Sequence, residues 1–228
     1  ILIEESVKAE NPGFGHSVQN DLVVPYLLSH TTQEQKKRWL PKICSGEIIG
    51  ALAMTEPGGG SDVAAIKTLA KDMGDHFLVN GSKSFITNGL LADLVIVACK
   101  TDSKAGAHGI SLIILERGME GFERGNKLDK IGQAGQDTAE LFFKDVKVPK
   151  ENLLGEEGKG FYYMMESLPK ERLSIAAGAI AVIEFVLDLT IQYCHDRKAF
   201  GQKIGSFQNS KFKLAEMTTE AEIGRTFY

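Results

Sequence analysis

Apolar residues change their spacing twice along the chain, and this change constrains the fold more than any other feature of the sequence. Apolar side chains follow a helical spacing over residues 1–46, alternate in short stretches up to residue 157, and return to a helical spacing over 158–228. We therefore expect a multi-domain α+β fold. Its parts would be an incomplete N-terminal helical segment (1–46), a central antiparallel β-barrel or sandwich domain (47–157) and an incomplete C-terminal helical bundle (158–228).

Local signals define elements of the first two segments. Two overlapping capping boxes in Thr31–Gln35 predict a helix over Gln33–Cys44, with Trp39 on its buried face. The dipeptide Asn80-Gly81 is a strong hairpin signal and predicts that two antiparallel strands meet there at a turn. The expected strands are Phe77–Val79, Lys83–Ile86, Leu94–Ala98, Ile110–Leu115 and Ala139–Val148.

The last segment has the pattern of a long amphipathic helix. Its apolar residues recur at intervals of three, four and seven, which predicts one buried stripe down a central helix. The members of the stripe are Leu168, Ile175, Ala179, Val182, Val186, Leu189 and Tyr193. A second helix is expected to begin near Phe207.

Charge and composition exclude several classes of protein. With a net charge of −4 there is no global basic field, so no nucleic-acid partner is expected. Three widely spaced cysteines and five histidines form no metal-ligand pattern, so we expect reduced thiols and no metal. No uninterrupted apolar run approaches the roughly 18 residues that span a bilayer, and no signal peptide is visible, so we expect a soluble, unsecreted protein without a membrane span. Because the chain starts at Ile1 and stops at Tyr228 inside an expected helix, we expect it to be a fragment.

The segment Met54–Asp62 has the composition of a ligand-binding loop. Three consecutive glycines allow close approach of the backbone to a ligand, and Thr55 and Ser61 place a hydroxyl on either side of them. Such a loop can hold a phosphate or a flat cofactor, although it matches neither of the common glycine-rich phosphate motifs. The alternative is that Pro57–Gly60 is only a tight surface turn.

Glu171 falls on the apolar stripe of the long helix, where a carboxylate would be removed from water. Burial favours the neutral acid and raises its pKa, which makes Glu171 a candidate general base near neutral pH. The alternatives are an ion pair, for example with Lys170 or Arg172, and a frayed helix start just after Pro169.

Two further groups of candidate residues could either contact a ligand or have a purely structural role. The ring of Phe85, followed by Ile86 and Thr87, could stack on a flat cofactor, or it could belong to the barrel core. Arg197 and Gln208 could contact phosphate or amide groups, but an arginine near a helix C-terminus is also favoured by the helix dipole.

Four motifs in this order resemble the acyl-CoA dehydrogenase flavoprotein family over essentially the whole chain, most closely its long-chain branch. The motifs are Met-Thr55-Glu-Pro-Gly-Gly-Gly-Ser61-Asp, Asn80-Gly-Ser-Lys-Ser-Phe85-Ile-Thr87-Asn-Gly, Phe142-Phe-Lys-Asp-Val-Lys-Val-Pro149-Lys-Glu-Asn-Leu-Leu-Gly and Arg197-Lys-Ala-Phe200-Gly. Many members of the family have Trp at the position of Phe85, whereas Phe is similar to the long-chain branch.

The resemblance implies which residues contact FAD and acyl-CoA. Thr55 would donate to the flavin ring, Ser61 would contact the pyrophosphate and the acyl-CoA, and Thr87 would lie near flavin N5. The implied FAD contacts are Leu52, Met54, Thr55, Gly60, Ser61, Phe85, Ile86, Thr87, Arg197, Phe200, Phe207 and Gln208. The implied substrate contacts are Ser61, Pro169, Lys170 and Arg172. The contacts from Arg197 onwards would reach the FAD of a neighbouring subunit, which implies a homodimer or homotetramer.

The resemblance also implies a reaction. Most relatives take their catalytic glutamate from a later segment, whereas Leu168-Pro-Lys-Glu171-Arg172 is similar to the branches that place it on this helix. The implied activity is FAD-dependent dehydrogenation of an acyl-CoA thioester to a trans-2-enoyl-CoA, with electrons passed to an electron-transfer flavoprotein, in a bacterial cytoplasm or a mitochondrial matrix. The alternatives are an acyl-CoA oxidase-like flavoenzyme and a non-catalytic module that binds FAD and acyl-CoA.

Overall fold

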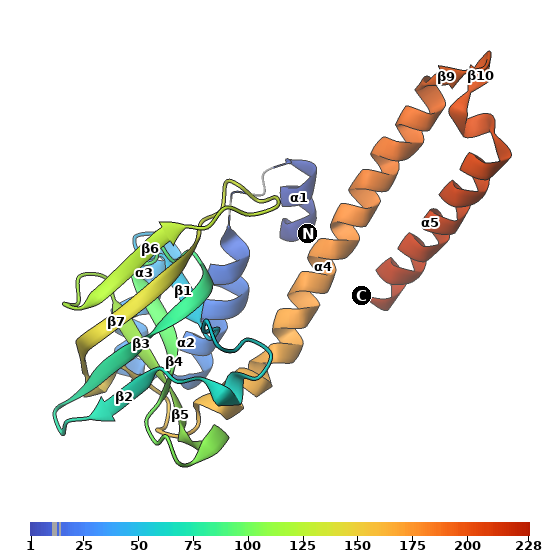
Figure 1. The fold of residues 1–228 in the computed structure, drawn as a ribbon. Helices are drawn as coiled ribbons and strands as arrows, with labels where there is room; N and C mark the ends of the chain where they lie inside the picture. The colour runs from blue at the N-terminus through green and yellow to red at the C-terminus, as the bar shows by residue number, and fades with distance from the viewer. Residues whose placement is uncertain (11–12, 14) are drawn as a thin grey trace. The chain divides into compact units, whose positions relative to one another are not determined.

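The computed structural model describes residues 1–10, 13 and 15–228 and separates into two compact units (Figure 1). One unit, Gly13–Lys170, contains the β-sheet and is called the sheet unit below. The other combines the N-terminal residues with Glu171–Tyr228 and is called the helical unit.

Among the described residues, the sheet unit holds one eight-stranded sheet with the order β6-β7-β3-β2-β4-β5-β8, and β1 pairs with β4. Its strands are β1 (Gly50–Ala53), β2 (Leu69–Asp72), β3 (His76–Thr87), β4 (Leu94–Lys100), β5 (Ile110–Glu116), β6 (Phe122–Lys127), β7 (Thr138–Pro149) and β8 (Leu153–Leu154). The pairings are antiparallel except that β1 and β2 each run parallel to β4. The predicted central β-domain is confirmed, with these two parallel pairings as a correction.

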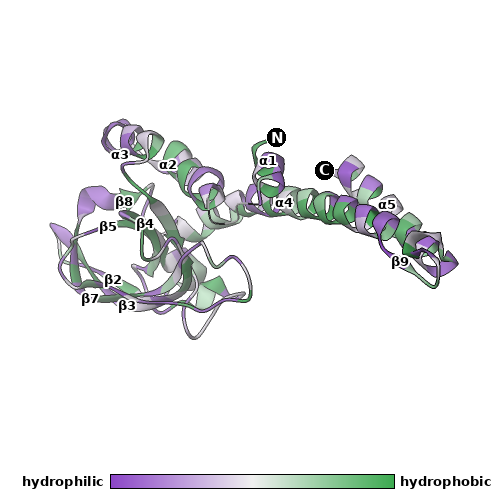
Figure 2. Cartoon of the chain, turned by 90° about the horizontal axis from the view of Figure 1, so that it is seen from above, coloured by the Kyte–Doolittle hydropathy of each residue, from purple (hydrophilic) through white to green (hydrophobic). Residues whose placement is uncertain are grey.

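Strand β4 is buried on both faces, because each face of the sheet has its own core. Val95, Val97 and Cys99 pack into one cluster with residues of β1, β3 and β7. The residues between them, such as Ile96, pack into a second cluster with the helices α2 (Val24–His30) and α3 (Gln33–Ser45). Figure 2 shows α2 and α3 along one side of the sheet. A strand between two layers is expected to be apolar throughout rather than alternating.

Helix α3 begins where the sequence predicts. The hydroxyl of Thr32 accepts from the backbone N–H of Gln35, and the Gln35 side chain accepts from the backbone N–H of Thr32. These two bonds satisfy donors that a helix start leaves unpaired. Trp39 is buried against the sheet, as predicted. Before α3, a π-helical stretch η2 (Val18–Val23) leads into α2, whose first turn contains Pro25.

The predicted hairpin at Asn80-Gly81 is wrong, because β3 is one continuous strand through these residues that pairs along β7. Gly81 is required by close packing rather than by a turn, since a Cβ there would lie 2.5 Å from Oγ1 of Thr68. The Asn80 side chain exchanges hydrogen bonds with Asp145 on β7, whose φ is 52°. A short polar side chain thus supports a left-handed residue in the neighbouring strand.

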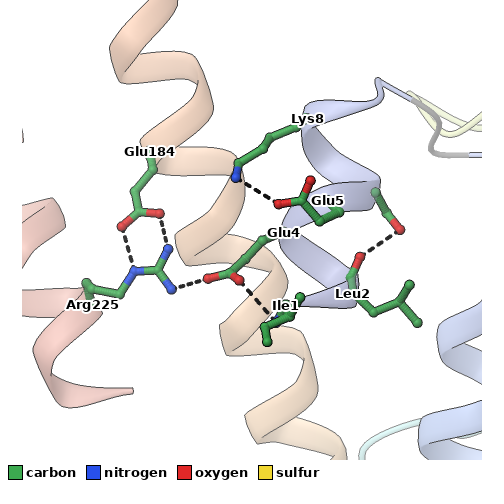
Figure 3. A network of polar contacts seen from close by, with 8 residues as sticks. Ile1, Leu2, Glu4, Glu5, Lys8, Glu184 and Arg225 are labelled. Atoms are coloured by element: carbon green, nitrogen blue, oxygen red, sulfur yellow. Dashed lines mark hydrogen bonds and ion pairs between the residues drawn. The ribbon is translucent and has the colours of Figure 1, made fainter.

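The helical unit consists of α1 (Leu2–Lys8), most of α4 (Gly160–Asp196) and α5 (Gln208–Phe227). Arg225 of α5 ties these helices together, because its guanidinium pairs with Glu184 of α4 and with Glu4 of α1 (Figure 3). Hydrogen bonds to Glu184 and then to Glu4 raise the pKa of Arg225 above its ordinary value. A small two-stranded hairpin, β9 (Lys198–Ala199) with β10 (Gln202–Lys203), joins α4 to α5.

Two expectations for the long helix need correction. Pro169 lies inside α4, which begins at Gly160, so the helix does not start at Pro169. Most of the predicted buried stripe is exposed within the described chain. The exposed members include Ile175, Val182, Val186, Leu189 and Tyr193. Figure 2 shows apolar residues along most of α4. The pattern predicts which side of the helix is apolar, but not which elements cover that side.

By length and composition alone, α4 could also cross a membrane. This corrects the expectation that no stretch is long enough, which rested on uninterrupted apolar runs. Within α4, a stretch of 18 residues has the mean hydropathy of a membrane-spanning helix even though it contains isolated charged residues. A single such helix is weak evidence for a membrane span, since core helices of soluble proteins have the same composition.

Candidate active site

The predicted ligand loop leaves the sheet at the end of β1. All four residues of β1, Leu52 among them, are buried, and the chain then turns at the surface. The backbone of Glu56 and Gly59 pairs in both directions, with N···O distances of 2.9 and 3.1 Å. Pro57 and Gly58 are exposed within this turn. Pro57–Gly60 therefore form a tight surface turn, with Thr55 and Ser61 on either side of it.

Phe85 projects from a β-bulge rather than into the core. The register of β3 against β7 shifts between Lys83 and Ile86, and Phe85 has a φ of 60°. The bulge turns the Phe85 side chain outward, so that it is 68% exposed, while Ile86 is buried. The alternative of an aromatic core residue is wrong. A left-handed backbone conformation costs free energy at a residue other than glycine. The fold therefore accepts a local cost at the position where this ring is exposed.

The fold brings the loop and the bulge together. The backbone N–H of Ser84 donates to the carbonyl oxygen of Thr55 at 2.9 Å. The ammonium of Lys83 donates to the carbonyl oxygen of Met54, also at 2.9 Å. Thr55 is thus held next to the strand residues that precede Phe85. Two segments that sequence reasoning singled out separately therefore form one surface of the sheet unit.

Sequence reasoning missed a buried ion pair under this surface. Lys83 is fully buried and Glu56 is 8% exposed, and the Lys83 ammonium lies 2.9 Å from Glu56 Oε1. Burial by itself raises the pKa of the Glu56 carboxyl, but the hydrogen bonds it accepts outweigh burial and hold that pKa below its ordinary value. Burial lowers the pKa of Lys83, and its interactions with Cys99 and Glu56 oppose this effect. The sequence signal was the alternation of β3, in which Lys83 falls on the same inward face as Phe77 and Val79.

Hydroxyl groups on this surface are available to a ligand. Among the described residues, the side chains of Thr55, Ser61 and Thr87 make no hydrogen bond to other protein groups. Ser61 is exposed, and the two threonines are half-buried. Hydroxyls that are already positioned and unpaired can donate to or accept from a bound group. A Cβ at Gly58 would meet nothing within 4 Å, so the turn also leaves open space.

The remaining candidate residues lie along α4 and the hairpin after it. Glu171 is 6% exposed and belongs to the helical unit, whereas Pro169 and Lys170 are exposed and close the sheet unit. Glu171 is therefore buried although most of the predicted stripe is exposed. Arg172 is exposed at the next position.

The hairpin between α4 and α5 presents an aromatic side chain to the outside. Phe200 has a φ of 51° at the turn and is 96% exposed. Its ring lies edge-on to that of Phe207, with centroids 6.3 Å apart. Arg197 and Gln208 are exposed beside it. Four predicted contact residues are thus grouped at one end of the helical unit.

Three sequence models together match nearly the whole chain. The N-terminal domain of acyl-CoA dehydrogenase matches residues 1–47, the middle domain matches 51–146 and the C-terminal domain matches 158–228. The chain belongs to the acyl-CoA dehydrogenase family.

Single relatives and solved structures resemble the chain over nearly its whole length. The mitochondrial long-chain specific acyl-CoA dehydrogenase of Mus musculus is 49% identical over 229 residues, which cover 100% of this chain and 53% of the relative. A crystal structure of an acyl-CoA dehydrogenase from Geobacillus kaustophilus is 54% identical with a TM-score of 0.96, over 99% of this chain and 60% of that chain. A structure described as the electron transferring flavoprotein of Acidaminococcus fermentans is 42% identical with a TM-score of 0.93, over 98% and 59% of the two chains. The chain spans about half the length of the curated relatives it matches.

Proposed function

We propose that the protein carrying this chain is an FAD-dependent acyl-CoA dehydrogenase, which converts an acyl-CoA thioester to the trans-2-enoyl-CoA. The observation that carries the proposal is the surface on which the exposed ring of Phe85 lies beside the loop of Thr55 and Ser61. Family membership supports the same activity. The central claim is that this surface binds the flavin and that Glu171 supplies the base.

The surface has the chemistry that a flavin requires. An exposed aromatic ring offers a stacking face to the isoalloxazine. Thr55 and Thr87 offer unpaired hydroxyls to the polar edge of the flavin ring, with Thr87 assigned to N5. Ser61, which is exposed just after the open turn, is suited to the pyrophosphate. Leu52, Met54, Gly60 and Ile86 complete the contacts that the sheet unit would make.

Glu171 is the proposed general base. Its carboxylate, which is 6% exposed, would take the proton from the α-carbon of the thioester. Bound FAD would supply the two-electron acceptor for the hydride that leaves the β-carbon. The substrate thus loses one proton and one hydride and gains a carbon–carbon double bond. Ser61, Pro169, Lys170 and Arg172 would contact the acyl-CoA.

The group at the α4–α5 hairpin supports an oligomer. The rings of Phe200 and Phe207 meet at this turn, and Phe200 is 96% exposed. Together with the exposed Arg197 and Gln208, this grouping supports a contact outside this chain. We propose that Arg197, Phe200, Phe207 and Gln208 contact the FAD of a neighbouring subunit in a homodimer or homotetramer.

An electron-transfer flavoprotein is the proposed acceptor of the electrons. The similarity to the structure described as the electron transferring flavoprotein of Acidaminococcus fermentans supports a link to such a protein. The mitochondrial relatives and the bacterial neighbour support a mitochondrial matrix or a bacterial cytoplasm as the location.

The visible absorption spectrum of the purified protein tests this function. We expect the flavin bands of the FAD-loaded protein to bleach when acyl-CoA thioesters of different chain lengths are added without oxygen. The thioester that bleaches fastest identifies the substrate class. Bound FAD that no thioester bleaches would instead support a non-catalytic binding module. Bleaching followed by rapid reoxidation with peroxide formation in air would support an oxidase.

A further inference from the structure

The buried Lys83–Glu56 pair is costly, and the proposed chemistry does not use it. Taking two charges out of water is unfavourable unless their geometry is good and the remaining hydrogen bonds are satisfied. Here the geometry is good, because the Lys83 ammonium lies 2.9 Å both from Glu56 and from the carbonyl oxygen of Met54. Neither residue is among the proposed FAD or substrate contacts. The question is what the pair holds in place.

The two residues that the Lys83 ammonium contacts lie directly before and directly after Thr55 in the chain. Met54, which accepts from Lys83, comes directly before Thr55, and Glu56 comes directly after it. Thr55 itself accepts from the backbone N–H of Ser84 at 2.9 Å. Because Lys83 and Ser84 are the two residues that precede the outward-facing Phe85, these bonds fix the loop relative to the bulge.

The Glu56 carboxylate also closes the base of the loop. Its Oε2 accepts from the backbone N–H of Lys67 at 2.7 Å, and its Oε1 accepts from that of Thr68 at 2.9 Å. The segment between Glu56 and Lys67, which contains Ser61, therefore starts and ends at one carboxylate. Thr68 in turn packs against Gly81 of β3. One ion pair thus connects the proposed pyrophosphate contact, the proposed ring contact and the strand that carries Phe85.

We propose that Lys83 and Glu56 are positioning residues that preform the flavin-binding surface before FAD binds. This inference rests on the proposed function of that surface. A preformed site does not have to order its loop during binding, so its affinity for the ligand is higher. Loss of either partner would leave the other charge buried and unpaired, and the loop would move to hydrate it.

The test compares FAD affinity and loop protection in the purified protein. We expect Lys83→Met and Glu56→Gln to weaken FAD binding by about tenfold to a hundredfold, the range seen when outer residues that orient metal ligands are removed. Lys83→Arg, which keeps the charge, should retain more of the affinity. Flavin fluorescence during titration of FAD-free protein measures the affinity. Lys150→Met is the matched control, because it removes a lysine whose ion pair with Asp72 lies in the same unit but away from the loop.

Hydrogen exchange of the FAD-free proteins separates positioning from general stability. We expect faster exchange at the amides of residues 54–68 in the Lys83 and Glu56 variants, while β4 and β5 exchange as in wild type. Glu56→Asp, which keeps the charge but shortens its reach, gives a milder variant if the others do not fold. Folded variants with wild-type FAD affinity and wild-type loop exchange would overturn the proposal, as would uniform exchange across the sheet. If wild type binds no FAD, the proposed function fails, while the loop exchange still decides whether the pair orders the loop.

Discussion

Replacing Glu171 with glutamine is expected to remove the bleaching of the flavin by acyl-CoA while leaving FAD bound. The amide has nearly the same shape as the carboxylate, so the buried position stays filled, but it cannot accept the α-proton. Loss of a positioned general base costs roughly 10²–10⁴-fold in rate. The measurement is the rate of bleaching after rapid anaerobic mixing with the preferred thioester.

Glu166 provides the matched control for this substitution. It lies on the same helix but is exposed, so Glu166→Gln removes the same charge without touching the proposed base. We expect Glu166→Gln to bleach at nearly the wild-type rate. Wild-type bleaching by the Glu171→Gln variant would show that the base is elsewhere.

Replacing Gly81 with alanine is expected to destabilise the sheet unit. The new Cβ would lie 2.5 Å from Oγ1 of Thr68 and 2.7 Å from its Cα, and φ at this position is 149°. The strand or the loop after Ala65 would have to move, and overpacking of this kind costs about 1–3 kcal/mol in the free energy of unfolding. Denaturant unfolding of both proteins measures the difference.

Gly58→Ala is the control, since a Cβ at Gly58 meets nothing within 4 Å. We expect its unfolding free energy to stay close to wild type. If Gly81→Ala left the free energy of unfolding equally unchanged, the close approach of Thr68 would not be the reason for the glycine.

The fold was predictable where the signal is local. The capping box at Thr32 defines the start of α3, and the apolar stretches define β4 and β5. The Asn80-Gly81 signal misled because a glycine can serve a turn or a close approach, and only the tertiary position of Thr68 distinguishes them. Sequence patterns do not record which distant backbone passes nearby.

The sequence singled out the candidate site residues one at a time, but it did not show how they lie relative to one another. The sequence left both a core position and a cofactor-facing position open for Phe85, and only the bulge in β3, which depends on the pairing with β7, turns the ring outward. The Lys83–Glu56 pair was missed because charged residues are expected in solvent and these two are 27 positions apart. For α4, the pattern predicted an apolar stripe, but no pattern within one helix says what covers it.

The most direct test of the central claim is the product formed by the FAD-loaded protein with an acyl-CoA thioester under anaerobic conditions. We expect one trans-2-enoyl-CoA for each flavin reduced, because the proton taken by Glu171 and the hydride accepted by FAD would leave the same substrate molecule. Flavin reduction without enoyl-CoA, or a thioester recovered unchanged beside oxidised flavin, would contradict it.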